Sequence, residues 1–256
     1  MSKTPVLIDF DGVIKLGKNP PPDAGEFLEF ILTKNIPSCI ISNSTLRTGK
    51  DVTQFLVDNQ LPSQVPAMTA ADATLQYVKE NYKKVSVYCV KEIRNLFKKF
   101  INDESPEAVI IGDNGENWSY RLMNEIFNKV YNGADIIAMQ KNRFWYPPGK
   151  GLSLDAGAFI KAIEYASGKE AVLIGKPSPI YFQSALSLLG FSKGLDFIMV
   201  GDDIESDIIG AQRAGGRGIL IYTGKTNYPF KDNTKIKPEF EAQNLMEVIE
   251  IIKEQL

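Results

Sequence analysis

Two carboxylates stand directly after the first short apolar run of the chain. Residues 6–8 lead into Asp9 and Asp11, which one residue separates in the sequence DFDGV. A carboxylate can attack phosphorus to form an acyl phosphate, and a second carboxyl nearby can protonate the departing oxygen. The same Asp-x-Asp-Gly pattern is also common in turns that do no chemistry. The pair alone therefore leaves a catalytic role and a turn both open.

Three later apolar runs also end in residues that suit phosphate chemistry. Residues 39–41 lead into Ser42, Asn43 and Ser44, residues 171–174 into Lys176, and residues 197–200 into the acids Asp202, Asp203 and Asp207. In an open parallel sheet, ligands bind beyond the carboxyl ends of the strands, where such residues converge. Several carboxylates that face a phosphate need a divalent cation, and ligands without His or Cys suit Mg²⁺. Lysine and hydroxyl groups can hold the phosphoryl oxygens.

Each of these residues also has an ordinary explanation when it is taken alone. Ser42 and Asn43 are common helix caps, and Asp203 and Asp207 favour the start of a helix through its dipole. Most lysines are solvated at the surface, and this is the ordinary expectation for Lys176 when it is taken alone. The ordered set of four segments is what favours phosphate chemistry over these separate explanations.

Composition narrows the classes of function. The sequence contains no histidine, which excludes a Ser-His-Asp triad, a zinc–histidine site and a histidine phosphocarrier. The formal net charge of -2 gives no reason to expect nucleic acid or an anionic membrane as partner. No apolar stretch is long enough to span a bilayer, and the first residues lack the apolar core of a signal peptide. We therefore expect a cytoplasmic protein in which Cys39 and Cys89 are reduced core residues.

Short apolar runs alternate with stretches of helical period, which predicts parallel strands joined by helices. The expected core strands are residues 6–8, 39–41, 171–174, 197–200 and 219–222, and the expected core helices are residues 24–34, 48–59, 180–189, 207–214 and 245–252. A second alternating block lies between them. Its expected strands are residues 85–90, 109–111 and 136–139, and its expected helices are residues 92–100 and 120–131. The segment PPGKG at residues 147–151 is a candidate hinge.

The four motifs together resemble the haloacid dehalogenase superfamily of phosphohydrolases, subfamily IIA. DFDGV resembles the first motif, with Asp9 as nucleophile and Asp11 as acid/base. IISNS and GKPSP resemble the second and third, in which Ser42, Asn43, Ser44 and Lys176 would bind phosphate. GDDIESD resembles the fourth, with Asp202 as metal ligand and Asp203 and Asp207 as supporting acids. The resemblance implies Mg²⁺ held by Asp9, the main-chain carbonyl of Asp11, and Asp202.

The resemblance also implies a fold and an activity. We expect a doubly wound, Rossmann-like parallel-sheet core at residues 1–81 and 151–256, with an inserted α/β cap domain at residues 82–150. The expected activity is phosphatase action on a small phosphorylated molecule through an aspartyl-phosphate on Asp9. Hydrolysis of pyrophosphate or of a nitrogen-linked phosphate, and a catalytically silent phosphate-binding scaffold, remain alternatives. A phosphoaspartate receiver is disfavoured, because there the acidic pair precedes the phosphorylated Asp.

The substrate itself is left open. Some family members that the chain resembles closely carry Ser at the position of Asp11, so their substrate preference does not transfer directly. Polar residues after the expected cap strands could meet the leaving group: Asp113, Asn114, Gln140, Lys141, Asn142 and Arg143. For Asn142 and Arg143, a solvated loop is the simpler interpretation. A homodimer is a further open alternative, since cap-mediated dimers are common in the family.

Overall fold

The structure is a computed structural model that describes residues 4–145, 149, 151–191, 194, 196–230 and 237–255. By its internal contacts the chain forms two compact units. The first contains the residues up to Ser42, Gly49–Met68 and the residues from Lys176 onward, and the second contains Asn43–Thr48 and Thr69–Gly175. Of the predicted hinge at residues 147–151, only residues 149 and 151 are described.

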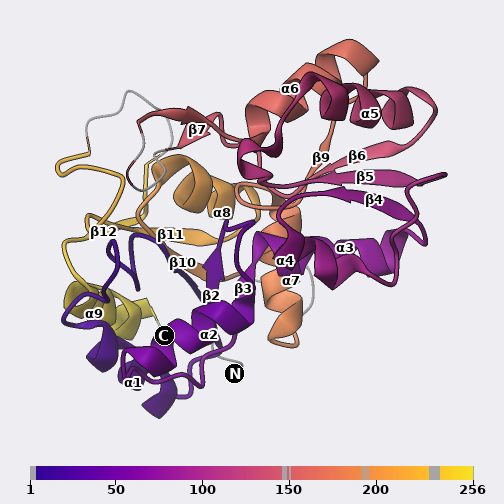
Figure 1. Cartoon of the computed structure of the whole chain (residues 1–256). Coiled ribbons are helices and arrows are strands. Elements are labelled where there is room, and N and C mark those ends of the chain that lie inside the picture. Colours follow the sequence, from indigo (N-terminus) through magenta and orange to yellow (C-terminus); the bar gives the residue numbers. More distant parts are fainter. Residues whose placement is uncertain are drawn as a thin grey trace. The chain divides into compact units, whose positions relative to one another are not determined.

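The sheet of the first unit has the strand order β12-β11-β10-β1-β2-β3 over the described residues (Figure 1). The strands are β1 (Val6–Asp9), β2 (Ser38–Ser42), β3 (Ala67–Thr69), β10 (Ile198–Gly201), β11 (Arg217–Ile221) and β12 (Phe240–Ala242). Strand β1 pairs in parallel with β2 on one side and with β10 on the other. The chain therefore winds outward from β1 in both directions, and β1 and β10 flank the switch point at which such sheets bind ligands.

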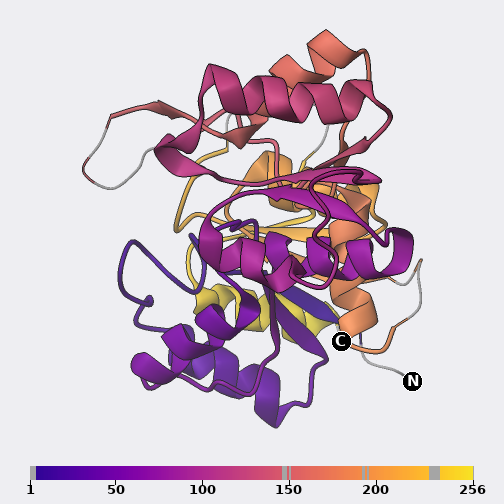
Figure 2. The ribbon, with the colours of Figure 1, turned by 45° about the vertical axis from the view of Figure 1, so that its right-hand side comes forward.

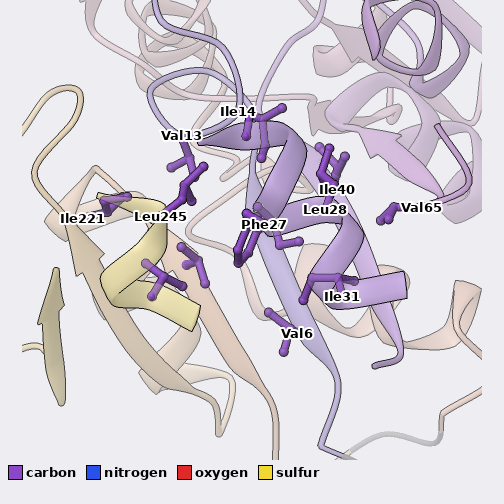
Figure 3. Close-up of a cluster of buried hydrophobic side chains, with 14 of the residues drawn as sticks. Val6, Val13, Ile14, Phe27, Leu28, Ile31, Ile40, Val65, Ile221 and Leu245 are labelled. Carbon is purple, nitrogen blue, oxygen red and sulfur yellow. The ribbon is translucent and has the colours of Figure 1, made fainter. Parts of the chain in front are cut away.

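The strands of this sheet carry apolar side chains on both faces, and helices cover both faces. Helix α1 (Ala24–Thr33) buries Phe27, Leu28 and Ile31, which recur at helical spacing. With α2 (Gly49–Asp58) and α9 (Leu245–Gln255) it packs on Val6, Ile40 and Ile221 in the cluster shown in Figure 3. On β10 and β11 lie a π-helical turn (Ile204–Ile209) and α8 (Gly210–Arg213), which packs against α7 (Pro179–Leu188).

The second unit has its own parallel sheet with the order β4-β5-β6-β9. The strands are β4 (Val85–Tyr88), β5 (Ala108–Ile111), β6 (Asp135–Ala138) and β9 (Val172–Leu173). Helices α5 (Tyr120–Tyr131) and α6 (Ala156–Ser167) lie on one side of it, and α3 (Ala70–Asn81) and α4 (Lys91–Arg94) on the other (Figures 1 and 2). A short hairpin of β7 (Phe144–Trp145) and β8 (Ser153–Leu154) precedes α6.

Three details differ from the sequence predictions. The strand expected at residues 171–174 in the core sheet is β9, which pairs with β6 in the second sheet. The helix expected at residues 92–100 ends at Arg94, because the chain must turn back for Phe100 and Asn102 to hydrogen-bond to Val85 at the start of β4. The helix expected at residues 207–214 begins earlier, with the π-helical turn at Ile204.

The second compact unit is also wider than the predicted 82–150. It takes in α3 on one side of that range, and α6 with β9 on the other. The physical reason is burial, because α6 contributes Ala156, Ile160 and Ile163 to the same cluster as α5. Neither α3 nor α6 was expected from the sequence.

Two expectations about single features can be compared directly with the structure. Cys39 and Cys89 are both buried and neither is in a disulfide, in agreement with the prediction of core thiols. Within the described ranges, no helix has the length and apolar character needed to cross a membrane.

Candidate active site

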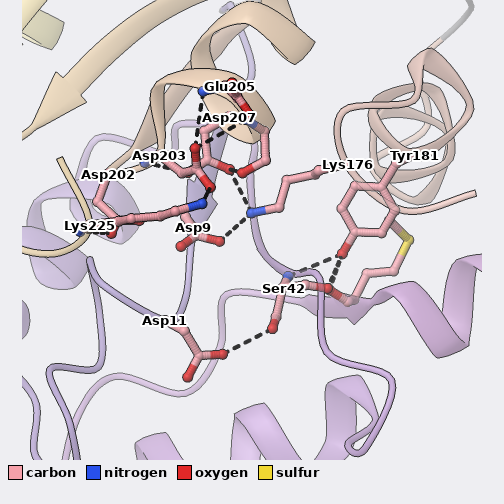
Figure 4. A network of polar contacts seen from close by, with 12 residues as sticks. Asp9, Asp11, Ser42, Lys176, Tyr181, Asp202, Asp203, Glu205, Asp207 and Lys225 are labelled. Atoms are coloured by element: carbon pink, nitrogen blue, oxygen red, sulfur yellow. Dashed lines mark hydrogen bonds and ion pairs between the residues drawn. The ribbon is translucent and has the colours of Figure 1, made fainter. Parts of the chain in front are cut away.

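Three buried carboxylates meet at the carboxyl ends of β1 and β10 (Figure 4). Asp9 is the last residue of β1, Asp202 directly follows β10, and Asp207 lies in the π-helical turn beyond it. One carboxylate oxygen from each lies within 4.8 Å of the others. Because β1 and β10 pair in parallel, with Ile8 opposite Val200, Asp9 ends β1 beside the end of β10, one residue before Asp202. The sheet thus brings together acids that are almost 200 positions apart in the sequence.

Lys176 lies between two of these acids. Its side chain is buried and forms ion pairs with Asp9 and with Asp207, the latter at 2.7 Å. Burial by itself lowers the pKa of Lys176, but Asp207 and Asp9 raise that pKa well above its ordinary value. The lysine is therefore charged at neutral pH. Within the described part of the chain, one buried cation faces three acids, so the cluster carries an excess of negative charge when all three acids are ionised.

This excess charge changes how the acids hold protons. Burial raises the pKa of Asp9 well above its ordinary value, although Lys176 lowers it in part. Burial, together with the charge of Asp207, raises the pKa of Asp202 to about 6. Both shifts arise because the ionised forms are poorly solvated and repel one another. A bound cation would relieve both effects.

Two glycine-containing loops confine the Asp202 carboxylate. A Cβ atom on Gly224 would lie 2.0 Å from Asp202 Oδ2, and one on Gly12 would lie 2.3 Å from it. The main-chain N–H of Lys225 donates to Asp202 Oδ2 at 2.5 Å, and Thr223 Oγ1 donates to the carbonyl of Gly12 at 2.6 Å. Sequence reasoning assigned no role to residues 223–225, although they follow β11 and thus obey the strand-end rule used for the other segments.

Asp11 lies outside the three-acid cluster. Its side chain is partly exposed, accepts from the Lys15 ammonium at 3.0 Å and accepts from Ser42 Oγ at 3.1 Å. The ion pair with Lys15 spans one turn of chain and was not expected from the sequence. These two contacts direct the Asp11 carboxylate toward Ser42.

The main chain of Ser42 is hydrogen-bonded to a buried tyrosine. The buried Tyr181 hydroxyl accepts from the Ser42 main-chain N–H at 3.1 Å. The same hydroxyl can donate to the carbonyl of Ser42 at 2.6 Å or to that of Met68 at 3.0 Å. Tyr181 lies in the first turn of α7, after the Ser178 cap, and it is buried on the same face as Ala185.

We expect Tyr181→Phe to lower the free energy of unfolding by about 1–3 kcal/mol, because buried main-chain groups of Ser42 lose a partner. Denaturant titration followed by circular dichroism measures this value. Tyr165→Phe is the matched control, since Tyr165 is 91% exposed and should change stability little. Equal stabilities for the two variants would show that the tyrosine hydroxyl does not support Ser42.

Asp203 forms hydrogen bonds and an ion pair with residues near it in the structure. Its side chain accepts from the N–H groups of Glu205 and Ser206 at the start of the π-helical turn, and pairs with Lys225 Nζ at 2.5 Å. The hydrogen bonds and charge of Lys225 outweigh burial and lower the pKa of Asp203. Asp203 thus caps the turn that carries Asp207, and it is absent from the three-acid cluster.

The remaining sequence candidates belong to the second unit. Asn43 and Ser44 follow Ser42 in the chain and are grouped with that unit, and Ser44 Oγ accepts from the N–H of Leu46. Gln140 is buried and donates to Asp155 at 2.7 Å, and Lys141 pairs with Glu164 at 2.6 Å. Asp113 accepts from the N–H of Gly115, Asn142 donates through its N–H to Gln140, and Arg143 lies over the Phe144 ring.

Comparison with known proteins agrees with this architecture. The sequence model of the haloacid dehalogenase-like hydrolases matches residues 6–100, and a second model, HAD-hydrolase-like, matches residues 173–248. Haloacid dehalogenase-like hydrolase domain-containing protein 2 of Bos taurus is 33% identical over 235 residues, which cover 91% of this chain and 88% of the relative. The chain belongs to the haloacid dehalogenase-like hydrolases.

A further sequence relative and a solved structure support the same family. The phospholysine phosphohistidine inorganic pyrophosphate phosphatase of Rattus norvegicus is 35% identical over 71% of this chain and 67% of its own length. The structure of NagD from E. coli K-12 superposes with a TM-score of 0.85 at 28% identity, over 96% of this chain and 98% of that one. The predicted family, subfamily IIA, and the predicted α/β fold with a second parallel α/β sheet are confirmed.

Proposed function

We propose that this chain is a Mg²⁺-dependent phosphatase in which Asp9 forms an aspartyl-phosphate. The observation that carries the proposal is the buried Asp9 carboxylate, which ends a core strand between the Lys176 ammonium and the acids Asp202 and Asp207. Membership of a hydrolase family supports it, as do the names of relatives that are phosphatases.

The donor set fits Mg²⁺. The three acids offer only oxygen ligands, and one lysine leaves their negative charge uncompensated. We propose that Asp9, Asp202 and the main-chain carbonyl of Asp11 hold the ion, as the family resemblance implies, with Asp207 keeping Lys176 in place. When bound, the ion compensates the charge of the acids and of the phosphoryl oxygens.

In the first half-reaction, an Asp9 carboxylate oxygen attacks phosphorus while the bond from phosphorus to the leaving oxygen breaks. Asp11 gives the leaving oxygen its proton. Lys176 and the Ser42 hydroxyl bind the phosphoryl oxygens, as do Asn43 and Ser44 in the loop that follows. The product is an acyl phosphate on Asp9 and a released alcohol or phosphate.

In the second half-reaction, water attacks the phosphorus of the acyl phosphate and Asp11 takes its proton. The bond between phosphorus and the Asp9 oxygen breaks, which frees inorganic phosphate and restores the carboxylate. We propose that the second unit acts as the cap that excludes water and selects the substrate. A cytoplasmic location and a homodimer remain predictions.

The proposed substrates are small phosphorylated molecules. A phosphomonoester is the first choice, and pyrophosphate or a nitrogen-linked phosphate is the alternative that the name of the pyrophosphate phosphatase relative suggests. The test is hydrolysis of p-nitrophenyl phosphate with Mg²⁺ and with chelator, followed by phosphate release from a panel containing all three substrate types. Release only with Mg²⁺ supports the proposal. A protein that releases no phosphate from any of them is a silent scaffold.

We expect the affinity for Mg²⁺ to fall as the pH falls through about 6. The pKa of Asp202 is raised to about 6, and a metal must displace the proton that the carboxyl holds below that pH. Each displaced proton weakens apparent binding by about tenfold per pH unit. Calorimetric titration of Mg²⁺ from pH 7.5 to pH 5 measures the slope.

The variant Asp202→Asn shows whether the fall in Mg²⁺ affinity comes from protonation of Asp202 or from acid unfolding of the protein. The variant should bind Mg²⁺ weakly at every pH and lose part of the slope. If wild-type affinity is flat across this range, Asp202 does not ligate the ion.

A further inference from the structure

The proposed acid, Asp11, is paired with a lysine that has no role in the proposed reaction. Lys15 Nζ lies 3.0 Å from Asp11 Oδ1, and Ser42 Oγ lies 3.1 Å from Asp11 Oδ2. The two carboxylate oxygens therefore have different partners. Figure 4 shows the carboxylate turned toward Ser42 and apart from the three-acid cluster.

A tight turn fixes where Lys15 stands relative to Asp11. The main-chain N–H of Lys15 donates to the carbonyl of Phe10 at 2.8 Å, and the N–H of Gly12 donates to the carbonyl of Lys15 at 2.9 Å. Gly12 has a φ of 106°, a conformation that residues with a side chain rarely adopt. Residues 13–14 of the turn are buried in the core of the first unit. The core therefore anchors the backbone on which the lysine and the acid face each other.

The Lys15 side chain has a second partner besides the acid. It is 17% exposed, and its ammonium lies over the Phe10 ring, 5.8 Å from the ring centre. That ring is buried and packs edge-on against Phe55, with ring centroids 5.2 Å apart. A cation over an aromatic face is attracted by the ring. Lys15 is thus better held than the Asp11 side chain, which is 46% exposed.

The contact with Lys15 matters most when a substrate is bound. Ser42 is proposed to bind the phosphoryl group, so its hydroxyl would then turn from Asp11 to a phosphoryl oxygen. A half-exposed carboxyl that loses this contact leaves more easily the orientation that proton transfer requires. The Lys15 ammonium holds Oδ1 without the help of Ser42, and it leaves Oδ2 on the side of the phosphoryl group.

We propose that Lys15 is a positioning residue that keeps Oδ2 of Asp11 facing the leaving oxygen. In the first half-reaction, the proton moves from Oδ2 to that oxygen as its bond to phosphorus breaks. In the second, the attacking water gives a proton back to Oδ2. The favoured substrates are therefore phosphate esters of ordinary alcohols, whose leaving oxygen needs a proton. This inference rests on the proposed phosphatase function.

Two esters of similar shape test the role of Lys15. p-Nitrophenyl phosphate releases a stable anion that needs little protonation, whereas benzyl phosphate releases an alcohol whose oxygen must receive a proton. We would measure kcat/KM, which includes the departure of the leaving group but not the later hydrolysis of the acyl phosphate. For Lys15→Met, kcat/KM should fall about tenfold or more with benzyl phosphate and less than about threefold with p-nitrophenyl phosphate.

Two further variants separate this role from a structural one. Lys15→Arg keeps a cation beside Asp11 and should restore kcat/KM for benzyl phosphate to within about threefold of the wild type. Lys18→Met removes an exposed lysine from the same connection between β1 and α1 and should leave both esters unchanged. The melting temperatures of all variants should lie within about 4 °C of the wild type, because partly exposed ion pairs contribute little to stability.

The outcomes distinguish this inference from the proposed function. Equal losses with both esters in Lys15→Met, behaviour like that of Lys18→Met, or a loss that Lys15→Arg does not restore would overturn the role of Lys15 and leave the phosphatase proposal intact. Hydrolysis of p-nitrophenyl phosphate alone by the wild type would do the same, because no acid would then be at work. A wild type that hydrolyses neither ester nor any substrate of the panel would instead overturn the proposed function.

Discussion

Asp9→Asn is expected to lower kcat for every hydrolysed substrate by at least about 10⁴-fold, because the amide cannot attack phosphorus. The change keeps the shape of the side chain at the end of β1. Phosphate release with Mg²⁺, measured with excess enzyme, quantifies the loss. Asp58→Asn makes the same change at an exposed position of α2 in the same unit and should keep full activity. Turnover that survives at position 9 would exclude Asp9 as the nucleophile.

The same variant should be more stable than the wild type when metal is removed. Burial raises the pKa of Asp9, so the folded protein retains a proton that the unfolded chain loses above about pH 4. The metal-free wild type therefore loses stability as the pH rises, and Asn removes this cost. In chelator, the melting temperature of Asp9→Asn should exceed that of the wild type at pH 7, and the two should converge toward pH 4. A lower melting temperature at pH 7 would contradict this account.

Lys176→Met is expected to lower the free energy of unfolding by about 3–5 kcal/mol and to abolish turnover. The buried lysine forms ion pairs with Asp9 and Asp207, and its removal leaves buried acids without a cation. Chemical denaturation at pH 7 in chelator measures the loss. The loss should shrink at acid pH, where the abandoned carboxyls take up protons.

Two further variants identify the cause of that loss. Lys253→Met removes an exposed ion pair with Glu250 and should cost less than about 1 kcal/mol. Lys176→Met combined with Asp207→Asn should recover part of the stability, because one unpaired acid is gone. If the double variant is no more stable than Lys176→Met alone, lost packing rather than lost charge compensation explains the effect.

The strand-end rule accounts for what could be predicted of the site. It grouped Asp9, Ser42, Lys176 and Asp202 from the alternation of apolar runs alone. Asp9 and Ser42 end the core strands β1 and β2, and Asp202 follows β10. Lys176 pairs with Asp9 although the strand before it, β9, belongs to the second sheet. The rule depends only on strand direction, which sequence periodicity indicates well. It could equally have been applied to residues 223–225, after β11.

Contacts between residues that are distant in the sequence could not be predicted from the alternation of apolar runs. The Tyr181 hydroxyl reaches Ser42 across 139 positions, and no local spacing encodes such a pair. The run at residues 171–174 has the composition of a buried strand, but composition does not say which of two parallel sheets a strand joins. The same limit explains why residues 156–167, which form α6, were placed with the core and not with the second unit.

The close approach of Gly12 and Gly224 to Asp202 has a consequence for truncated chains. The last acidic motif ends at Asp207, yet the atoms that confine the Asp202 carboxylate come partly from residues 223–225, beyond β11. A shortened protein that ended before residue 223 would keep every acid of the cluster. It would nevertheless lack the backbone N–H that holds Asp202 in orientation, so the four motifs alone do not define the smallest working unit.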